Sequence, residues 1–256
     1  MDKKSFINYI NYEDKTLVSS IYDKIILSEK CGKTIFTNDF LPPVIWNSIL
    51  KFKQEFDIEI EAYGVFKEAE RRMLTFTSSS IEQYPIDILR ITNKSQFSVL
   101  KHKDYLGAVM ALGIKREKLG DFVLYENHCY VPVCSEISDY IIFNLQSVGK
   151  NPCEVTVISD LTMEMPSVNL EDMTIISSSL RVDCIVSELC NLSRNSAAEI
   201  IKRGIVQINY EPIYEKDYML KDNSVLTVRG YGKFKFCNII SETSKGRLKI
   251  KIQKYK

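Results

Sequence analysis

The spacing of apolar residues predicts helices at the start of the chain, followed by a pair of strands. Leu17, Ile21 and Ile25 recur at helical spacing. In the run TNDFLPPVIWNSILKFKQEF, Asp39 precedes two prolines in the way typical of a helix start. The run DIEIEAYGVF then alternates polar and apolar residues, which predicts a half-buried strand, and RRMLTFTS is its expected partner. Residues 1–84 are therefore predicted to form an N-terminal helical and α+β subdomain.

The next region, residues 85–176, shows an ordered succession of elements. PIDILRIT is predicted to be a strand, KDYLGAVMALG a helix that stops at Gly113, and DFVLYE and HCYVPV two strands joined at Asn127. SEISDYIIFNLQSVG is predicted to be a helix that ends at Gly149, and CEVTVIS a strand. The order strand–helix–strand–strand–helix–strand is that of the ferredoxin-like split unit. Many RNA-binding domains and many enzymes use this fold, so the order alone decides no function.

A connector and a strand lead into the last region. SDLTMEMPSVNL is typical of a connector, and EDMTIISSS predicts a strand that runs into a serine-rich hinge at 177–179. We predict a domain boundary there, so that residues 177–256 form a C-terminal domain with a basic tail.

The C-terminal domain begins with two predicted helices. Four residues of the first share one helical face: Val182, Ile185, Val186 and Leu189. Ser193 is a good N-cap for the second helix, and Gly204 is its expected left-handed stop. Short strands follow, IVQIN and SVLTVRG, with a turn through 211–212 between them. The whole chain is thus predicted to be α+β, in three regions.

Composition and charge limit the class of protein. The seven cysteines include no CxxC pair, the start of the chain has no apolar secretion signal, and no apolar run approaches the roughly 18–20 residues that span a bilayer. We therefore expect a cytoplasmic location and no membrane partner. Net charge is +1, but residues 180–256 carry 15 Lys/Arg and 8 Asp/Glu, a balance of +7 against −6 elsewhere. This asymmetry favours a polyanion partner, although a lysine-rich end such as KIKIQKYK is also typical of a solvated edge strand.

The second helix of the C-terminal domain carries the most informative pattern. Ala197, Ile200 and Ile201 share one face, which predicts that this face is buried. Arg194, Ala198 and Lys202 form a stripe on the other side. A small residue between two cations lets a phosphate backbone approach closely, and the N–H groups at the helix start also favour phosphate. Ordinary solvated charges would give the same pattern.

A resemblance adds to this interpretation. The run SRNSAAEIIKRGIVQIN, with LRVD before it and VRGYGKFKF after it, resembles the RNA-binding domain named after small-subunit ribosomal protein S-four, over about residues 180–235. By position, the resemblance implies RNA contacts from Ser193, Arg194, Asn195, Lys202, Arg203 and Asn209, extended by Arg229, Lys233 and Lys235.

The full length resembles the YlmH-type proteins of Gram-positive bacteria. The residues that carry this resemblance are YGVFKEAERR (63–72), HKDYLGAVMALGIKREKLGDFVLYENHCYV (102–131) and SSLRVD at the junction. It implies a non-enzymatic RNA binder whose partners are ribosomal RNA or tRNA on the large ribosomal subunit, in the rescue of stalled subunits and quality control, with cell-division phenotypes. One departure concerns the predicted sheet, where DILRIT and HCYVPV supply a single aromatic residue, Tyr130, for base stacking.

The loop GIKREKLGD offers a second cluster of cations. It places Lys115, Arg116 and Lys118 close together, and such a cluster can grip phosphate. A solvated loop partly neutralised by Glu117 and Asp121 is the alternative.

Enzymatic and metal-binding alternatives are weaker. His102 and Asp104 form a His-x-Asp pair, but Asp104 also fits a helix-capping role. No finger-like spacing completes a zinc site around His128, and no phosphate-cradling or hydrolase motif is present. Asp183 resembles the catalytic aspartate of pseudouridine synthases, but its context is that of a helix start. We expect no enzyme activity, no metal, no cofactor and no small-molecule substrate; an RNA-modifying enzyme and a cell-division or assembly adaptor stay open as alternatives.

Overall fold

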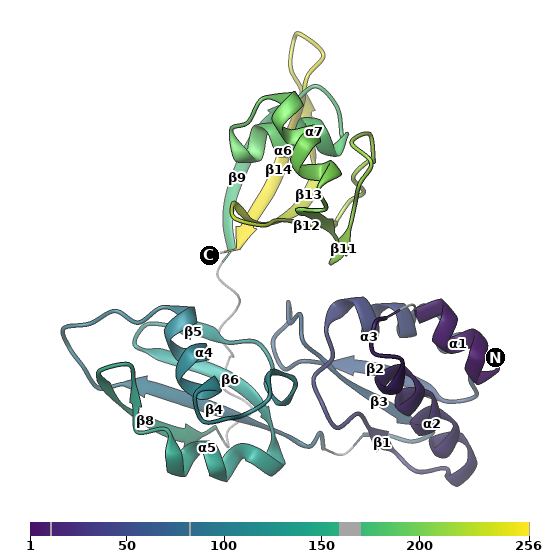
Figure 1. The fold of residues 1–256 in the computed structure, drawn as a ribbon, viewed down its shortest axis with the longest axis vertical. Coiled ribbons are helices and arrows are strands. Elements are labelled where there is room, and N and C mark those ends of the chain that lie inside the picture. Colours follow the sequence, from purple (N-terminus) through teal and green to yellow (C-terminus); the bar gives the residue numbers. More distant parts are fainter. Residues whose placement is uncertain (11, 82, 159–169, 256) are drawn as a thin grey trace. The chain divides into compact units, whose positions relative to one another are not determined.

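The computed structural model describes residues 1–10, 12–81, 83–158 and 170–255 (Figure 1). By its internal contacts the chain divides into two compact units, Met1–Val168 (unit 1) and Asn169–Lys256 (unit 2). The described residues form seven α-helices and three antiparallel sheets, an α+β architecture as predicted. No helix in this part of the chain is both long and apolar enough to cross a membrane.

Unit 1 begins with three helices packed on a small sheet. The predicted helices and strand pair are present, and the sheet order is β1-β3-β2. Asp39 does not start the third helix, since Pro42 occupies that position and Asp39 pairs with Lys118 instead. The elements are α1 (Lys3–Ile10), α2 (Lys15–Cys31), β1 (Ile35–Phe36), α3 (Pro43–Leu50), β2 (Glu59–Tyr63) and β3 (Met73–Thr77).

The second sheet of unit 1 has the order β5-β6-β4-β8-β7. The predicted order of strands and helices is present, with one additional strand. The second helix ends at Asn144, and the short strand β7 takes the place of its expected last turns. Gly149, at φ +61°, closes the turn that pairs β7 with β8. The elements are β4 (Ile86–Asn93), α4 (His102–Met110), β5 (Val123–Tyr125), β6 (His128–Cys134), α5 (Ser138–Asn144), β7 (Ser147–Val148) and β8 (Asn151–Val157).

Both faces of this second sheet are engaged. Buried residues of α4 and α5, such as Val109 and Ile141, pack with Leu89 of β4 on one face. On the other face Tyr130 is buried with Phe66, from the segment between β2 and β3. The single aromatic residue of the predicted stacking strands is therefore covered and presents no ring to a base.

Unit 2 is one six-stranded sheet with two helices on one face. Its order is β11-β10-β12-β13-β14-β9. Buried residues of both helices pack with Phe234 and Phe236 of β13 in a single core. The elements are β9 (Leu170–Ser177), α6 (Val182–Cys190), α7 (Arg194–Lys202), β10 (Val206–Ile208), β11 (Glu211–Pro212), β12 (Val225–Val228), β13 (Gly232–Glu242) and β14 (Leu248–Tyr255).

The C-terminal lysine-rich segment is not a solvated edge strand. It forms β14, which pairs with β13 on one side and with β9 on the other. Because β9 is the outer strand of this sheet, unit 2 begins before the predicted boundary at residue 177. The further division of unit 1 near residue 85 stays a prediction.

The serine-rich segment before α6 is an ordered corner rather than a hinge. Ser177 is fully buried, and its hydroxyl donates to the carbonyl oxygen of Ser179 at 2.8 Å. The hydroxyls of Ser178 and Ser179 both lie 3.4 Å from the Cys184 sulfur. These contacts attach the end of β9 to the start of α6, so the link belongs to unit 2. The connector predicted over 159–170 lies, apart from its last residue, outside the described residues.

The pairing of β9 with β14 gives a direct test of where unit 2 begins. We expect a fragment spanning 169–256 to unfold cooperatively, and a fragment spanning 178–256 to be strongly destabilised. The shorter fragment loses the β9 ladder along the whole of β14 and exposes Ile250 and Ile252, which are at most 1% exposed. Thermal unfolding followed by circular dichroism measures the difference. Equal stability of the two fragments would contradict the assignment of β9.

Candidate nucleic-acid interface

Helix α7 has the start and the stop that its sequence predicts. The hydroxyl oxygen of Ser193 accepts a hydrogen bond from the backbone N–H of Ser196 at 3.1 Å, which confirms Ser193 as the N-cap. At the other end Gly204 adopts φ +68°, and its N–H donates to the carbonyl oxygen of Ile201 at 2.8 Å. Both ends of the helix are therefore fixed by local hydrogen bonds.

The buried face of α7 is the predicted one. Ala197 and Ile201 are fully buried in the core of unit 2, and Ile200 packs against that core. Arg194 and Lys202 are exposed, and Ala198 between them is half-buried. The cationic stripe therefore faces away from the sheet.

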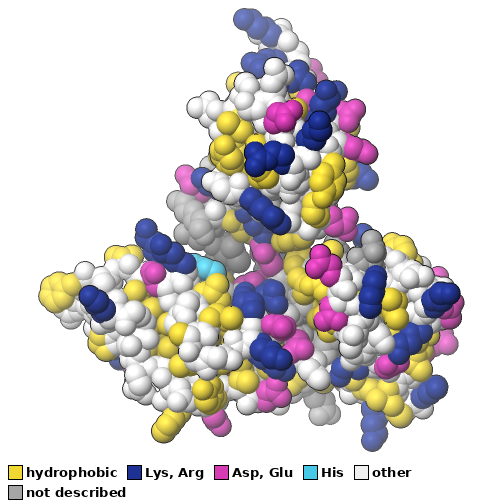
Figure 2. Space-filling model, viewed as in Figure 1, with side chains coloured by type: hydrophobic (Ala, Val, Ile, Leu, Met, Phe, Trp, Pro, Cys, Tyr) yellow, Lys and Arg dark blue, Asp and Glu magenta, His cyan; other side chains and the backbone are white. Residues whose placement is uncertain are grey.

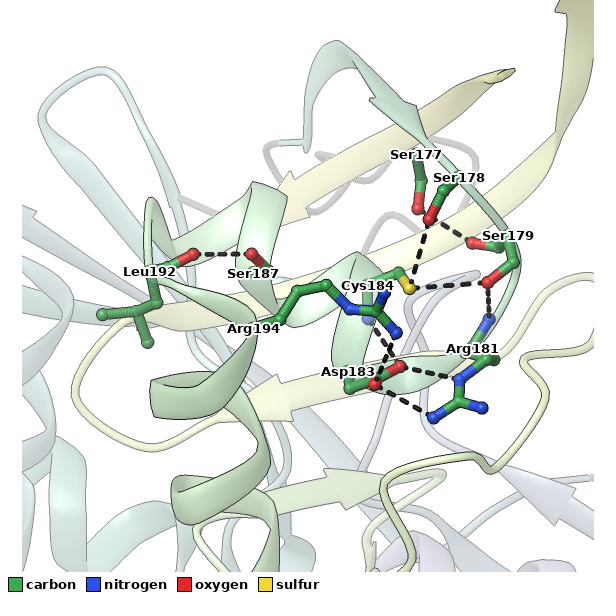
Figure 3. Close-up of polar contacts among 9 residues, drawn as sticks. All are labelled: Ser177, Ser178, Ser179, Arg181, Asp183, Cys184, Ser187, Leu192 and Arg194. Atoms are coloured by element: carbon green, nitrogen blue, oxygen red, sulfur yellow. Dashed lines mark hydrogen bonds and ion pairs between the residues drawn. The ribbon is translucent and has the colours of Figure 1, made fainter. Parts of the chain in front are cut away.

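Arg194 also has a partner within the protein. Its guanidinium donates to a carboxylate oxygen of Asp183 at 3.0 Å, and Arg181 donates two hydrogen bonds to the same carboxylate, both at 3.1 Å (Figure 3). The Asp183 side chain is only 5% exposed, whereas that of Arg194 is 58% exposed. An arginine carries five N–H donors, so Arg194 can hold Asp183 and still donate to a phosphate.

The two arginines keep Asp183 ionised. Burial alone would raise the pKa of Asp183, but the hydrogen bonds from Arg181 and Arg194 outweigh it and lower this pKa to about 2. Asp183 lies in the first turn of α6, as expected of a helix-start residue, and it joins that turn to the first residue of α7. The sequence predicted the place of Asp183 but not its pairing with Arg194, which lies eleven residues further along.

More cations gather where α7 ends. Lys202 and Arg203 are exposed at its last turn. The backbone N–H of Arg229 donates to the carbonyl oxygen of Ile205 at 3.2 Å, so the β12–β13 turn lies beside the segment that leaves the helix. Arg229 is exposed as well. Three of the predicted RNA-contacting cations therefore lie at one end of α7.

Tyr214 joins this group, and the sequence did not single it out. A Cβ atom at Gly204 would lie 3.0 Å from the Tyr214 ring, so the ring rests against the glycine. Tyr214 is nevertheless 65% exposed. An exposed aromatic ring beside cations suits base stacking. Gly204 was the feature of the sequence that could have indicated this contact, because a glycine has no side chain and leaves room for a neighbouring ring.

We call this group of residues the α7 surface. Figure 2 shows Lys and Arg side chains, interspersed with Asp and Glu, on the face of unit 2 that carries α6 and α7 in Figure 1. The α7 surface comprises Ser193, Arg194, Asn195, Ala198, Lys202, Arg203, Tyr214 and Arg229.

Two other predicted RNA contacts lie on the opposite face of the sheet. Phe234 and Phe236 point into the core under the helices, so Lys233 and Lys235, which alternate with them along β13, point the other way. Lys233 lies between the rings of Tyr210 and Tyr255, 4.6 and 4.5 Å from their centres, and its burial lowers its pKa to about 7. Lys233 and Lys235 are therefore not part of the α7 surface.

Asn209 has a structural role in the β10–β11 turn. Its backbone has φ +49°, and its side-chain oxygen accepts from the N–H of Val225 at 2.9 Å. This asparagine thus holds the turn against β12. We do not count it in the α7 surface.

In the loop with Lys115, Arg116 and Lys118, two of the three cations are held by partners within the protein. Arg116 donates to the carbonyl oxygens of Leu119 and Gly120, at 2.7 and 3.0 Å, and burial lowers its pKa to about 10. Lys118 pairs with Asp39 at 2.8 Å and Glu136 at 2.6 Å. Burial alone would lower the pKa of Lys118, but the hydrogen bonds that it donates to these two carboxylates raise it. These two cations hold the parts of unit 1 together, which leaves Lys115 as the exposed cation of the loop.

The enzymatic and metal candidates have structural roles. The Asp104 carboxylate accepts from the backbone N–H of Lys101 at 2.8 Å, which confirms the capping interpretation. Cys129 is fully buried, which raises the pKa of its thiol. Within the described residues, no three His, Cys, Asp or Glu side chains are grouped to hold a metal ion.

Comparison with known proteins gives a family match within unit 1. Residues 79–161, about a third of the chain, match a family model described as a putative RNA-binding domain in YlmH. A similar protein is "Ribosome-associated protein quality control protein P2" of Bacillus subtilis (strain 168), which is 24% identical over 222 residues and is matched over 85% of this chain and 86% of its own length. A solved structure, "Cell division protein ylmH from Streptococcus pneumoniae", is 17% identical, with a TM-score of 0.49 over 61% of this chain and 96% of that one.

Neutralising Asp183 tests the network under the α7 surface. We expect Asp183→Asn to destabilise unit 2 by about 2 kcal/mol at pH 7, since a pKa lowered from 3.8 to about 2 corresponds to about that free energy. A carboxyl group whose pKa is lower in the folded than in the unfolded protein stabilises the fold at pH values above its unfolded pKa. This stabilisation is lost as the pH falls through the folded pKa. The difference from the wild type should therefore shrink between about pH 4 and pH 2.

Urea unfolding of the full chain at several pH values measures this effect. Asp222→Asn, at an exposed position, is the matched control and should cost within about 0.5 kcal/mol. A pH-independent difference for Asp183→Asn would show that the carboxylate does not stabilise the junction of α6 and α7.

Proposed function

We propose that this protein docks on structured RNA through the α7 surface, without catalysing a reaction. The RNA is ribosomal RNA or tRNA held on the large ribosomal subunit, in the rescue of stalled subunits. One observation carries the proposal: exposed cations along α7 and at its C-terminal end surround a half-buried alanine and an exposed tyrosine ring. Phosphate contacts need such cations, and a ring beside them can stack on a base.

The similar proteins support this choice of partner. The Bacillus subtilis relative is named for ribosome-associated quality control, and residues 79–161 match a putative RNA-binding domain. We therefore propose two RNA-contacting regions, one in each unit. The large subunit, as against another ribosomal particle, is the finer part of the proposal and rests on the resemblance to YlmH-type proteins.

Finer assignments of fold belong to the same proposal. The strand order β5-β6-β4-β8 and the helices α4 and α5 support a ferredoxin-like classification of the middle region. The order of α6, α7 and the strands that follow supports an S-four-type domain in unit 2.

The absence of a catalytic step is proposed from the roles of the acidic candidates. Asp183, which resembles a catalytic aspartate, is saturated by two arginines, and Asp104 caps α4. A carboxylate held ionised by two guanidinium groups is a weak general base. Both Asp183 and Asp104 therefore have a structural role at the position that they occupy.

Charge reversal at the end of α7 tests the proposed interface. We expect Lys202→Glu combined with Arg203→Glu to weaken association with purified large subunits by at least tenfold. The slope of log affinity against log salt should fall by about two, because two phosphate contacts are lost. Co-sedimentation at several salt concentrations measures both. Arg194 is left unchanged because its guanidinium lies 3.0 Å from the Asp183 carboxylate. A glutamate at position 194 would place a second negative charge beside Asp183.

The control for this variant carries the same change of net charge. Lys245→Glu with Lys249→Glu alters two exposed lysines of the β13–β14 hairpin, outside the α7 surface. It should bind almost as well as the wild type. If both double variants lose affinity equally, overall charge rather than the α7 surface accounts for binding.

Ala198 tests close approach rather than charge attraction. It is half-buried between Arg194 and Lys202, so Ala198→Gln adds bulk without charge. We expect a loss of affinity of about tenfold with little change in melting temperature. Glu199→Gln, at an exposed neighbouring position, should bind as well as the wild type or slightly better. Unchanged binding of folded Ala198→Gln would rule out close packing of RNA on the helix.

A further inference from the structure

A loop of unit 1 presents two apolar side chains almost entirely to solvent. It connects β4 to α4, and within it Phe97 is 99% exposed and Val99 92% exposed. A single exposed apolar residue needs no explanation. Here the order of the loop, the cleft beside it and its charge all bear on what Phe97 contacts.

The loop is held in place by its polar residues. The Asn93 side-chain amide, only 5% exposed as a residue, donates to the Ser98 carbonyl oxygen at 3.0 Å and accepts from the Ser95 N–H at 2.9 Å. The Ser98 hydroxyl donates to the side-chain oxygen of Asn151, at the start of β8, at 2.6 Å. Phe97 is thus presented from a loop attached on both sides of it, which lowers the entropy cost of binding through its ring.

A polar cleft lies next to this loop. Its volume is about 570 Å³, within the roughly 300–1,000 Å³ of clefts that accept small organic groups. The walls include Asn127 and Glu126, whose amide and carboxylate groups can donate and accept hydrogen bonds, whereas Asn93 and Ser98 shape the cleft through the bonds that they make within the protein. The edge of an unpaired nucleobase needs both kinds of partner.

The charge around Phe97 favours a polyanion. Residues 93–103, NKSQFSVLKHK, contain three lysines and no acidic residue. Lys101 and Lys103 are exposed, while Lys94 pairs with Glu154. An aromatic ring followed closely in the chain by exposed lysines suits single-stranded nucleic acid, since the ring stacks on a base and the lysines meet the phosphates.

We propose that this loop is a contact for unpaired RNA, in which Phe97 stacks on one base and a neighbouring nucleotide enters the cleft. It takes the place of the usual stacking sheet, because Tyr130 of that sheet is buried. The inference rests on the proposed function only in taking RNA as the ligand. It assigns a second site, in the region that matches a putative RNA-binding domain.

The test compares single-stranded with base-paired RNA on the full chain. The probes are a fluorescently labelled single-stranded oligoribonucleotide of mixed sequence and a hairpin of the same length, and fluorescence anisotropy gives the affinities. Phe97→Ala should weaken single-strand binding by about 5- to 150-fold, the range expected for one stacked base. Hairpin binding should change less than twofold. Phe97→Tyr should restore single-strand affinity to within about twofold.

Phe143→Ala is the matched control, because Phe143 is an 80% exposed phenylalanine of α5, on another element than the loop, and lines a pocket with Asp139. It should bind like the wild type, and both alanine variants should keep the wild-type melting temperature, since neither ring is buried. Loss of affinity by Phe143→Ala as well would attribute the effect to general hydrophobicity and overturn the proposal.

The Lys202/Arg203 variant separates this site from the α7 surface. If it binds hairpin RNA normally while Phe97→Ala loses the single strand, the α7 proposal fails and the loop proposal stands. If Phe97→Ala binds both probes like the wild type, or the wild type does not bind the single strand, the loop proposal fails. If Phe97→Ala weakens association with ribosomal particles but not binding of either RNA probe, the partner of Phe97 is a protein, which also overturns the proposal.

Discussion

Burial of one face of α7 decides what unit 2 can present. Ala197 and Ile201 are fully buried against the sheet. At about 100° per residue, this orientation turns Ala198 and Lys202 away from the core and leaves Arg194 at the flank of the buried face, within reach of Asp183. The same packing brings the first residue of α7 to Asp183 of α6, and the left-handed Gly204 after the helix leaves room for Tyr214. The α7 surface is therefore a consequence of the core beneath it.

Whether a cation is available to RNA depends on its partners inside the protein. Arg116 and Lys118 are held by carbonyl oxygens and carboxylates, and Lys233 lies between two tyrosine rings. Lys202 and Arg203 are exposed at a helix end. A charge count along the sequence gives all these residues the same weight. They differ because a cation that already has partners in the protein must lose them before it can bind phosphate, which costs free energy.

The sequence predicted local features well and long-range ones poorly. Ser193 and Gly204 are recognisable because caps and stops depend on adjacent residues. The ladder between β9 and β14 was missed, and with it the ordered corner at Ser177, because such a pairing joins residues far apart in the chain. The serine run was typical of a hinge, and only the sheet shows that its first residue is buried. The contact sites of RNA themselves stay predictions.

The central claim is that RNA lies on the helix-bearing face of unit 2. Ultraviolet crosslinking of the full chain to purified ribosomal particles, followed by mass spectrometry of the nucleotide-bearing peptides, tests it most directly. The account predicts adducts on peptides that contain Lys202, Arg203 and Tyr214. Adducts confined to peptides around Lys235 and Lys249, with none on α7, would contradict it.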